Sequence, residues 1–398
     1  MPHTKRIAYG AKNLNDLPED LLSRILSFLP IEVAATTSTI SKRWRYLFLF
    51  APKLKFTYHE GDNGLTFVEF VARMLVSRGM TPIEKLSLHL VEGVDGDRVH
   101  GLILKALELG LSDLDLQIYN LDNWSGPSPH VFVAKKLSRL AIGTDCIINV
   151  ERGCVDLPKL KTLHLDDVQF TDGNTGLSKL LSGCPVLEVL SLVDINWYDW
   201  DVCCVSSTRL KKMRIHWESY DDDKDRNGCP KSVIFNTPNL QCLHYSDDNA
   251  RQYPTANFHK LDGAKIQLIR RNAEEEEENV VGHATHFWKG ICNVDTLSIT
   301  SDTLKVLTFC CDPIPVFKNL TQLSIKTGPE LGWESLPGLL NKSPQLETLF
   351  LKVIKTSLNH RVPPQKVEKR FECEGADEDR KTLMEQVKHF LKEMKPEE

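Results

Sequence analysis

Basic side chains alternate with apolar ones between residues 212 and 216, where Lys212, Arg214 and His216 are separated by single apolar residues. Successive side chains of a strand point to opposite faces, so these three basic groups would share one face. In a following apolar segment, His244 has the same phase and would stand roughly 5 Å away on the next strand. Arginine suits bidentate contact with carboxylates and phosphates. The four residues therefore predict a site for an acidic or phosphorylated stretch of another protein, and a plain hydrated strand face is the alternative.

Two other groups of polar residues have the spacing of metal ligands only in part. Residues 223–228 match the first half of a calcium-binding EF-hand loop, but the twelfth position is Ile234, where that loop needs a bidentate glutamate. His283 and His286 stand three residues apart, with no acid or cysteine at ligand spacing and no Cys-x-x-Cys pair in the chain. We expect no metal site and no cofactor, and an acidic turn at residues 223–228.

Motifs of catalysis are missing from the sequence. There is no Gly-x-Ser-x-Gly elbow, no phosphate-binding glycine loop with its lysine, and no glycine-rich dinucleotide turn. The run of acids from Glu274 to Glu278 predicts a hydrated loop, because dense like charges repel one another. The alternative, functional interpretation is that this acidic run docks a basic substrate. The chain is predicted not to be an enzyme.

Composition excludes several classes of protein. The 398 residues are 41% hydrophobic and 26% charged, which is typical of a globular protein, and the net charge of −5 gives no reason to expect nucleic-acid binding. No apolar run reaches the eighteen or so residues needed to cross a bilayer, so no membrane is expected. Eleven cysteines without a framework spacing favour reduced thiols. The first residues lack the apolar core of a signal peptide, and we expect the nucleus and/or the cytoplasm.

The elements that must position the basic residues recur along most of the chain. An apolar residue, any residue and a second apolar residue form a Leu-x-Leu-like phrase, and the starts of successive phrases stand 21 to 33 residues apart. This spacing is typical of leucine-rich repeats, in which each unit contributes one short strand and cannot bury its core alone. The predicted fold class is α/β, with a parallel sheet on the concave face of a repeat solenoid and partly helical, partly irregular return segments. The phrases start at Leu86, Leu114, Leu140, Leu163, Leu190, Met213, Leu243, Ala264, Leu297, Leu323 and Leu349.

A compact helical module precedes the repeats. Pro18 fits the first position of a helix, and Leu21, Ile25 and Leu29 recur every four residues along one face before a break at Pro30. A second piece leads into the block from residue 41 to residue 47, which contains Trp44. Short helices cannot bury this much apolar surface among themselves, so part of it should meet a partner. An ordinary three-helix cap on the following domain is the alternative.

This module resembles the F-box in its Leu-Pro start, its Ile-Leu helix, the Leu29-Pro30 break and the Ser-Lys-Arg-Trp-Arg block. The resemblance implies binding to the Skp-type adaptor, and through it to the cullin, of a Skp–cullin–F-box ubiquitin ligase. The residues that would make the adaptor contact are Leu17, Pro18, Leu21, Leu22, Ile25, Leu29, Pro30 and Trp44.

The repeats resemble those of the plant F-box/leucine-rich-repeat proteins, as in the phrases at residues 180–192 and 237–240. Residues 67–78 are similar to the linker helix of that family, and residues 367–371 and 379–392 to part of its terminal FBD domain. The expected organisation is a flexible tail (1–12), an F-box (13–56), a linker helix (57–82), a leucine-rich-repeat solenoid (83–355) and a partial FBD-like cap (356–398).

Together the two modules imply a substrate-recognition subunit. The F-box would bind the adaptor, and the outward side chains of the strands would bind an unknown target protein for ubiquitination. The tentative target-binding residues are Lys212, Arg214, His216 and His244. A scaffold or inhibitor that uses its repeats without a ligase is the alternative function.

Overall fold

The protein folds into two compact units in the computed structural model. The first comprises Met1–Ile147 with Asp156–Leu160, and the second comprises Ile148–Val155 with Lys161–Glu398. The structure describes residues 14–29, 31–58, 64–91, 93–119, 121–150, 155–197, 200–217, 230–248, 250, 252–269, 284–311, 313–327, 335–355, 365–372, 383 and 385–389.

The first unit starts with short helices: η1 (Leu14–Asp16), α1 (Glu19–Leu26), α2 (Ile31–Thr36), η2 (Thr37–Thr39) and η3 (Trp44–Phe50). Pro18 precedes α1 in an extended conformation, with φ of −55° and ψ of 150°. Glu19 and Asp20 occupy the first turn, where their charge favours the positive end of the helix dipole. Trp44 and Leu47 of η3 are buried and pack with α1. This packing gives the module a small core of its own.

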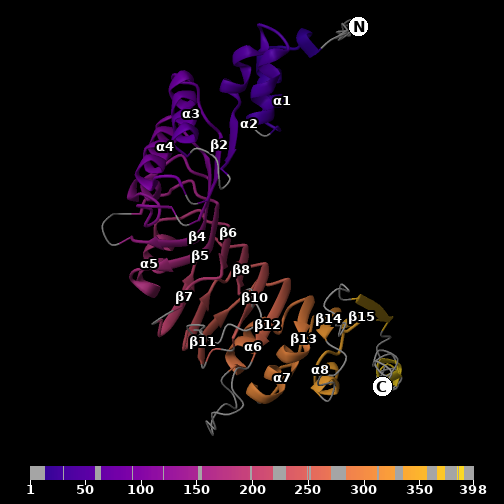
Figure 1. The fold of residues 1–398 in the computed structure, drawn as a ribbon. Coiled ribbons are helices and arrows are strands. Elements are labelled where there is room, and N and C mark those ends of the chain that lie inside the picture. Colours follow the sequence, from indigo (N-terminus) through magenta and orange to yellow (C-terminus); the bar gives the residue numbers. More distant parts are fainter. Residues whose placement is uncertain are drawn as a thin grey trace, which may run out of the picture. The chain divides into compact units, whose positions relative to one another are not determined.

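The same unit continues with β1 (Lys53–Thr57), α3 (Gly64–Ser77), β2 (Lys85–Leu90), α4 (Gly96–Glu108), β3 (Asp113–Ile118), η4 (Pro129–Val133) and β4 (Arg139–Ile148). Figure 1 shows α3 and α4 side by side, and the four strands pair in parallel in chain order. The sheet therefore begins one strand earlier than the sequence predicted. Leu54 and Phe56 of β1 are buried, and this alternation lets β1 join the edge of the sheet beside β2.

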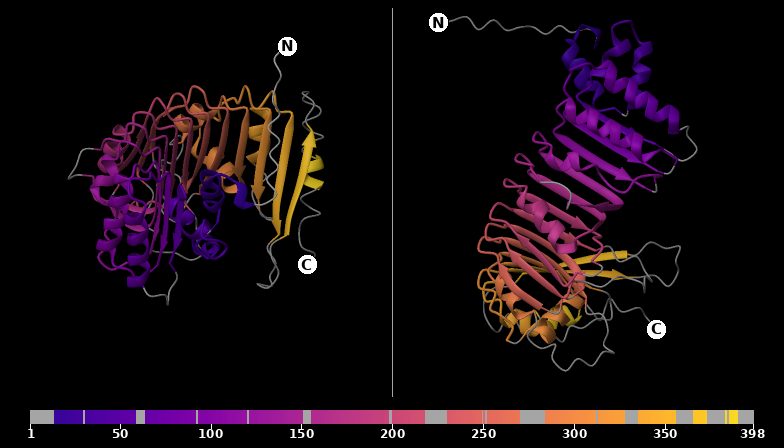
Figure 2. Two further views of the ribbon diagram at one scale, coloured as in Figure 1. Left: turned by 90° about the horizontal axis from the view of Figure 1, so that it is seen from above. Right: turned by 90° about the vertical axis from the view of Figure 1, so that its left-hand side faces the viewer.

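The second unit contains the remaining repeat strands, which lie side by side in Figure 2. They pair in parallel in the order β5, β6, β8, β10, β12, β13, β14 and β15, and the last strand, β16, pairs antiparallel with β15. All eleven Leu-x-Leu phrases are strands, including the weak copy at Ala264, so the prediction of a mixed α/β fold with a mostly parallel sheet is confirmed. The bounds in this sheet are β5 (Thr162–Phe170), β6 (Val189–Val193), β8 (Lys212–His216), β10 (Cys242–Asp248), β12 (Gly263–Ile269), β13 (Thr296–Thr300), β14 (Gln322–Thr327), β15 (Thr348–Lys355) and β16 (Gln365–Glu372).

The return segments differ from the prediction in three repeats. There they are strands, β7 (Val202–Ser206), β9 (Ser232–Asn236) and β11 (Gln252–Asn257), which form a second parallel sheet. β7 and β9 bury alternate residues, such as Val233 and Phe235 of β9, whereas β11 buries only Tyr253. Period-two burial therefore operates on both sides of the repeats that contain β7 and β9. Other return segments are helices, as predicted: α5 (Gly173–Ser182), α6 (Thr285–Ile291), α7 (Ser301–Cys310) and α8 (Leu336–Asn341).

Near the chain's end, β16 agrees with the strand predicted at residues 367–371. Leu383 and Val387 are buried, as expected of the apolar side of the predicted terminal helix, whereas Phe390 and Leu391 lie outside the described residues. In the part of the chain that the structure describes, no helix is both long enough and apolar enough to span a membrane.

Candidate functional site

Helix α1 presents two different apolar faces. Leu22 and Leu26 are turned inward, at 0% and 1% exposure, where η3 packs against the helix. Leu21 and Ile25 share the adjacent face of the helix, and Leu29 follows just after its end; these three side chains remain 42%, 40% and 38% exposed. The stripe predicted from the four-residue spacing is therefore a surface feature. Helix α1 both stabilises the module and leaves apolar area open to a partner.

The eight residues predicted to contact an adaptor do not share one environment. Pro18 is exposed beside the outer stripe, and Leu17 is half-buried with its carbonyl oxygen accepting a 2.6 Å hydrogen bond from the Arg43 guanidinium. Leu22 and Trp44 lie in the module's own core, so they support the surface from inside. Pro30 lies outside the described residues. Further large apolar side chains that sequence reasoning left out are also exposed on this module: Leu14, Phe28, Val33, Ile40, Tyr46 and Phe50.

The second candidate surface is the outward face of the sheet in the second unit. Met213 and Ile215 of β8 are buried, whereas Lys212 is exposed and Arg214 and His216 are half-buried. The alternation predicted for this strand is therefore present. The neighbouring β10 repeats it, with Leu243 and Tyr245 buried and His244 half-buried on the outward face.

Strand pairing brings a further cation to this face. His244 lies directly opposite Arg214 of β8 on one side and Lys265 of β12 on the other. These three residues form what we call the basic row. Sequence reasoning missed Lys265 because the copy at Ala264 is weak, although its position between Ala264 and Ile266 already marks it as outward. In the same register Ser191 faces Arg214, and Ser298 faces Lys265.

The electrostatics of the basic row are those of crowded positive charge. Burial lowers the pKa of His244 to about 4, with Lys265, His216 and Arg214 acting in the same direction and a hydrogen bond with Gln267 opposing them. Burial and then the charges of Lys326, Arg214 and Lys352 lower the pKa of Lys265. The His216 and His244 rings lie 5.1 Å apart between centroids. His244 is therefore neutral at pH 7, and the lysine and arginine charges around it repel one another.

Acidic compensation is absent from the basic row itself. Arg214 and Lys265 form no ion pair with any acid among the described residues, and the Arg214 Nε and His244 Nε2 atoms are shielded from solvent without a hydrogen-bond partner there. Two acids on more distant strands of the same sheet, Asp166 of β5 and Glu368 of β16, are engaged elsewhere. Asp166 lies 3.8 Å from His164, and Glu368 lies 3.3 Å from the Lys352 ammonium.

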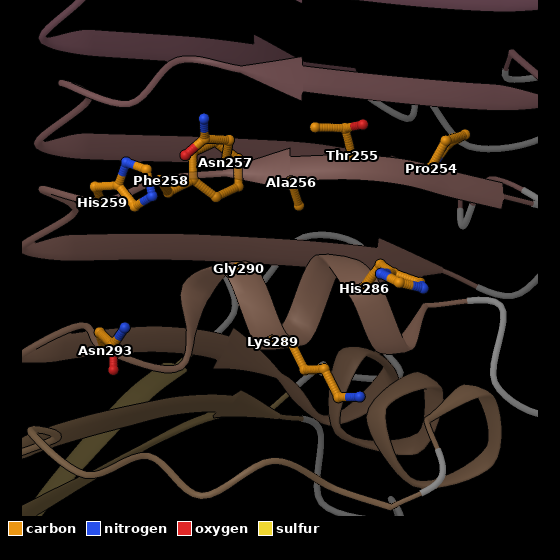
Figure 3. A pocket seen from close by; sticks show the side chains of 10 residues that line it. All are labelled: Pro254, Thr255, Ala256, Asn257, Phe258, His259, His286, Lys289, Gly290 and Asn293. Carbon is orange, nitrogen blue, oxygen red and sulfur yellow. The ribbon is translucent and has the colours of Figure 1, made fainter.

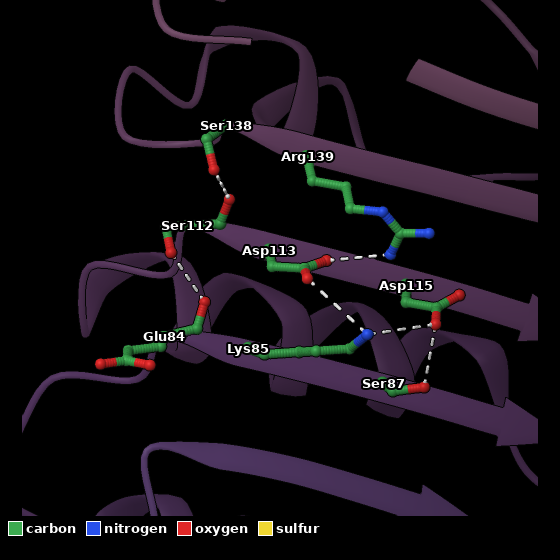
Figure 4. Close-up of polar contacts among 8 residues, drawn as sticks. All are labelled: Glu84, Lys85, Ser87, Ser112, Asp113, Asp115, Ser138 and Arg139. Carbon is green, nitrogen blue, oxygen red and sulfur yellow. Dashed lines mark hydrogen bonds and ion pairs between the residues drawn. The ribbon is translucent and has the colours of Figure 1, made fainter. Parts of the chain in front are cut away.

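Charges on the outward face of the first unit are, by contrast, neutralised (Figure 4). The Lys85 ammonium lies 3.7 Å from Asp113 and 3.8 Å from Asp115, and the Arg139 guanidinium lies 3.3 Å from Asp113. The hydroxyl of Ser87 donates a 3.3 Å hydrogen bond to Asp115. The formal charges of these two carboxylates and two cations cancel. We therefore regard the cluster as a structural network and not as a ligand site.

A groove of about 460 Å³ lies between β11 and α6. In Figure 3 its polar side chains are spread along its length, with His259 toward one end and His286 toward the other. The helix approaches the strand closely at Gly290, where an added Cβ atom would lie 2.4 Å from the carbonyl oxygen of Ala256. A small-molecule site requires polar groups that converge on one point, and the polar groups of this groove do not.

The candidate metal-binding residues and the acidic run of the sequence form no site in the described part of the structure. Residues 223–228, residues 274–278 and His283 lie outside the described residues, and His286 is exposed on α6. Across the described ranges, no three histidine, cysteine or acidic side chains are grouped so that they could hold a metal ion.

Comparison with known proteins identifies both parts of the chain. Residues 14–53 match the F-box domain family, and residues 101–260 match the family described as "FBD-associated F-box protein At5g56370, LRR repeats". The Arabidopsis thaliana F-box/LRR-repeat protein At4g14103 is 42% identical over 85% of this chain and 91% of its own length. This chain belongs to the F-box/LRR-repeat proteins.

Two more family members from Arabidopsis thaliana extend the match over nearly the whole chain. The F-box/LRR-repeat protein At4g14096 is 40% identical over 96% of this chain and 85% of its own length. The F-box/LRR-repeat protein At3g59210 is 42% identical over the same shares. Family membership supports a substrate-adaptor role, since F-box/LRR-repeat proteins are generally non-catalytic adaptors: the F-box generally implies Skp-type adaptor binding, and the repeats indicate protein binding.

Proposed function

We propose that this F-box/LRR-repeat protein is the substrate-recognition subunit of a Skp–cullin–F-box ubiquitin ligase. The observation that carries the proposal is the outer stripe formed by Leu21 and Ile25 of α1 and by Leu29 just after it. These side chains are exposed although the helix packs its Leu22 and Leu26 side against η3. A module that needed these residues only for its own stability would bury them. Exposed apolar area of this kind marks a protein contact.

The chemistry of such a subunit is proximity. A target protein held on the outward face of the repeats would be presented to a charged conjugating enzyme on other subunits, which raises the effective concentration of the target lysine. No catalytic group on this chain is needed for that step. The nucleus and/or the cytoplasm stays the predicted location.

Co-purification tests the proposal. The tagged full-length chain is expressed in plant cells and the recovered proteins are identified by mass spectrometry, for the natural sequence and for a Leu21→Asp, Ile25→Asp variant. We expect an adaptor and a cullin with the natural chain and neither with the variant, because charges at an apolar contact are left desolvated and unpaired.

A matched control uses apolar residues that are exposed elsewhere in the first unit. Val76 lies in the last turn of the linker helix α3 and Met80 follows that helix, and they are 67% and 88% exposed. The variant Val76→Asp, Met80→Asp should retain adaptor and cullin. Recovery of target proteins without adaptor or cullin would instead favour a scaffold or inhibitor that acts through its repeats alone.

A further inference from the structure

The groove between β11 and α6 has a shape that suits an extended chain. In Figure 3 residue numbers rise in the same direction along both walls, with Pro254 and His286 at one end and His259 and Asn293 at the other. One wall consists of the six consecutive residues 254–259, which at about 3.3 Å per extended residue span roughly 17 Å. A groove of this length has room for about five residues of an extended peptide.

The floor of the groove is made by small or buried residues. Ala256 and Gly290 face each other in its middle, and an added Cβ atom at Gly290 would lie 2.4 Å from the carbonyl oxygen of Ala256. Although β11 is the last strand of its sheet, a further strand would need a spacing of about 4.8 Å, and the helix already occupies that space. Phe258 is 3% exposed and closes the floor beyond the strand. A bound segment must therefore lie over the floor and be held by the side chains of the rim.

Side-chain amides on the rim are suited to a peptide backbone. The amide nitrogen of Asn257 donates a 3.1 Å hydrogen bond to Oδ1 of Asn236, whose own amide nitrogen donates to the Ser206 hydroxyl at 3.2 Å. The remaining amide atom, Oδ1 of Asn257, is shielded from solvent and has no hydrogen-bond partner among the described residues. Buried polar atoms are almost always hydrogen-bonded, and a peptide N–H would supply the missing donor. Asn293 is exposed on the other wall and can donate and accept as a peptide group does.

The charge of the groove indicates the charge of its occupant. Three basic residues line it, His259, His286 and Lys289, and none of the described lining residues is acidic. His286 and Lys289 are both exposed and stand three residues apart, on one face of α6. Complementary charge favours the right partner and like charge disfavours wrong ones, so an acidic segment fits and a basic one does not.

The groove is separate from the outward face of the main sheet. Tyr253 of β11 and Tyr245 of β10 meet in the core, with their hydroxyl oxygens 3.4 Å apart. The ring of Phe287 of α6 lies 5.6 Å from that of Tyr245 between centroids. The core of these repeats thus lies between the groove and the strands that carry the basic row, so a ligand in the groove leaves that row open.

We propose that the groove between β11 and α6 binds an extended acidic segment of a partner protein. A backbone N–H of the segment donates to Oδ1 of Asn257, and an acidic side chain of the segment lies within reach of Lys289. This partner is distinct from a target held on the outward face of the sheet, and both can be bound at once. The inference does not depend on the ligase assignment.

Peptide capture tests the occupant. The full-length chain is immobilised and offered a degenerate library of short linear peptides with two fixed glutamates, and, separately, the same library with two fixed lysines. We expect retention of the glutamate library and little of the other. Equal retention of both, or preference for the lysine library, would overturn the proposal. For a peptide selected from the library, N-methylation of each backbone nitrogen in turn should weaken the affinity about fivefold or more at one position at least, and no effect at any position would exclude backbone recognition.

Substitution of the amide locates the binding. Asn257→Leu removes the shielded acceptor and should weaken the affinity for the selected peptide about fivefold or more. Asn236→Leu is the matched control, because it makes the same change in the same row of amides at an exposed position that does not line the groove. Unchanged affinity in Asn257→Leu, or an equal loss in Asn236→Leu, would contradict the site. Circular dichroism of each variant checks that it is folded.

Substitution of the charge distinguishes the groove from the outward face. Lys289→Gln should weaken the affinity about twofold to fivefold, and the difference should vanish in concentrated salt because an exposed ion pair is screened. Lys212→Gln is the control, since Lys212 is an exposed lysine of the outward face. A loss in Lys212→Gln with none in Lys289→Gln would place the peptide on the outward face and overturn the proposal.

Two further readouts separate this inference from its alternatives. Replacement of the run Glu274–Glu278 by glutamine should leave peptide binding in place. Binding by that variant and not by the natural chain would mean that the chain's own acidic run is the occupant, and would overturn the choice of a partner protein. Adaptor binding is measured on the same samples and should be retained by the groove variants, so a failure of the ligase assignment leaves peptide capture to be judged by itself.

Discussion

The guanidinium group of Arg78 donates a hydrogen bond to the backbone carbonyl oxygen of Ala51 at a distance of 2.9 Å. It also donates to the carbonyl oxygens of Leu49 and of Pro82, the latter at 3.0 Å. Arg78 is 2% exposed, and burial lowers its pKa to about 10. One buried cation thus joins the end of the F-box module to the segment that follows the linker helix.

Replacement of this cation should destabilise the first unit. In Arg78→Met three carbonyl oxygens lose their donor, and each buried acceptor left without a partner costs about 1–3 kcal/mol. We expect a loss of about 3 kcal/mol, measured by chemical denaturation. Arg73→Met is the control, because Arg73 lies on α3, the helix that ends just before Arg78, with an exposed side chain and only an i,i+4 pair with Glu69. That control should change stability by less than about 0.5 kcal/mol, and equal losses in the two variants would contradict the buried bridge.

The Arg78 contacts show what sequence could not reveal. They join residues 27 and 29 positions apart, and nothing in the local sequence distinguishes Arg78 from the other arginines of the chain. The repeat strands could be predicted because every copy needs two inward apolar residues at a fixed separation, and even Ala264 and Ile266 satisfy that need. The strand at Leu54 and Phe56 has the same alternation, but it stands at the end of the F-box segment, before the first Leu-x-Leu phrase at Leu86.

The two candidate sites were predictable to different degrees. The outward positions of β8 and β10 follow from period two, but Lys265 becomes a neighbour of His244 only through strand pairing. On α1, the spacing predicts which apolar residues share a face. It does not predict which face the rest of the module covers, because Leu22 and Leu21 are chemically equivalent and only tertiary packing against η3 separates them.

Single substitutions on α1 should separate stability from binding. Leu22→Ala removes a fully buried side chain and should cost about 2–5 kcal/mol of stability. Leu21→Ala removes an exposed one and should leave the thermal transition almost unchanged while weakening adaptor binding, by about 2 kcal/mol if Leu21 is an anchor of the contact. Thermal denaturation and adaptor titration of both variants check this. A Leu21→Ala variant that binds the adaptor normally would remove this residue from the proposed contact.

The repeat strands should tolerate charge on one face only. Leu190 is fully buried, so Leu190→Asp would bury an unpaired carboxylate at a cost of several kcal/mol and unfold neighbouring repeats. Leu163→Asp should do the same. Ser191→Asp is the matched control, since its side chain is on the outward face opposite Arg214 and would gain a positive partner. Circular dichroism melting curves distinguish these outcomes, and a native transition in Leu190→Asp would contradict the inward orientation.

Stability should depend on the protonation of His244. Its pKa is about 4 in the folded chain and about 6.5 in an unfolded one, so the unfolded state binds more protons between these values. The contribution of the neutral His244 ring to the free energy of unfolding is therefore present above pH 6.5, declines as the pH falls, and is lost below pH 4. His244→Gln removes it. Between pH 7.5 and 5.0 the melting temperature of this variant should fall less than that of the natural chain, by about 2 °C after allowing for screening of a half-exposed ring. Parallel curves for the two proteins would show that the ring is not held neutral.

Two helical glycines should respond in opposite directions to the same change. At Gly290 of α6 an added Cβ atom would stand 2.4 Å from the carbonyl oxygen of Ala256, so Gly290→Ala must push the helix from β11 and should cost about 1–3 kcal/mol. At Gly338 of α8 the nearest atom is Cδ1 of Ile314 at 3.6 Å, an ordinary contact. Gly338→Ala should therefore stabilise the protein by about 0.5–1 kcal/mol, because alanine loses less backbone entropy on folding. Differential scanning calorimetry of the two variants gives the sign of each effect. A rise in melting temperature for Gly290→Ala would mean that α6 and β11 are not in close contact at this position.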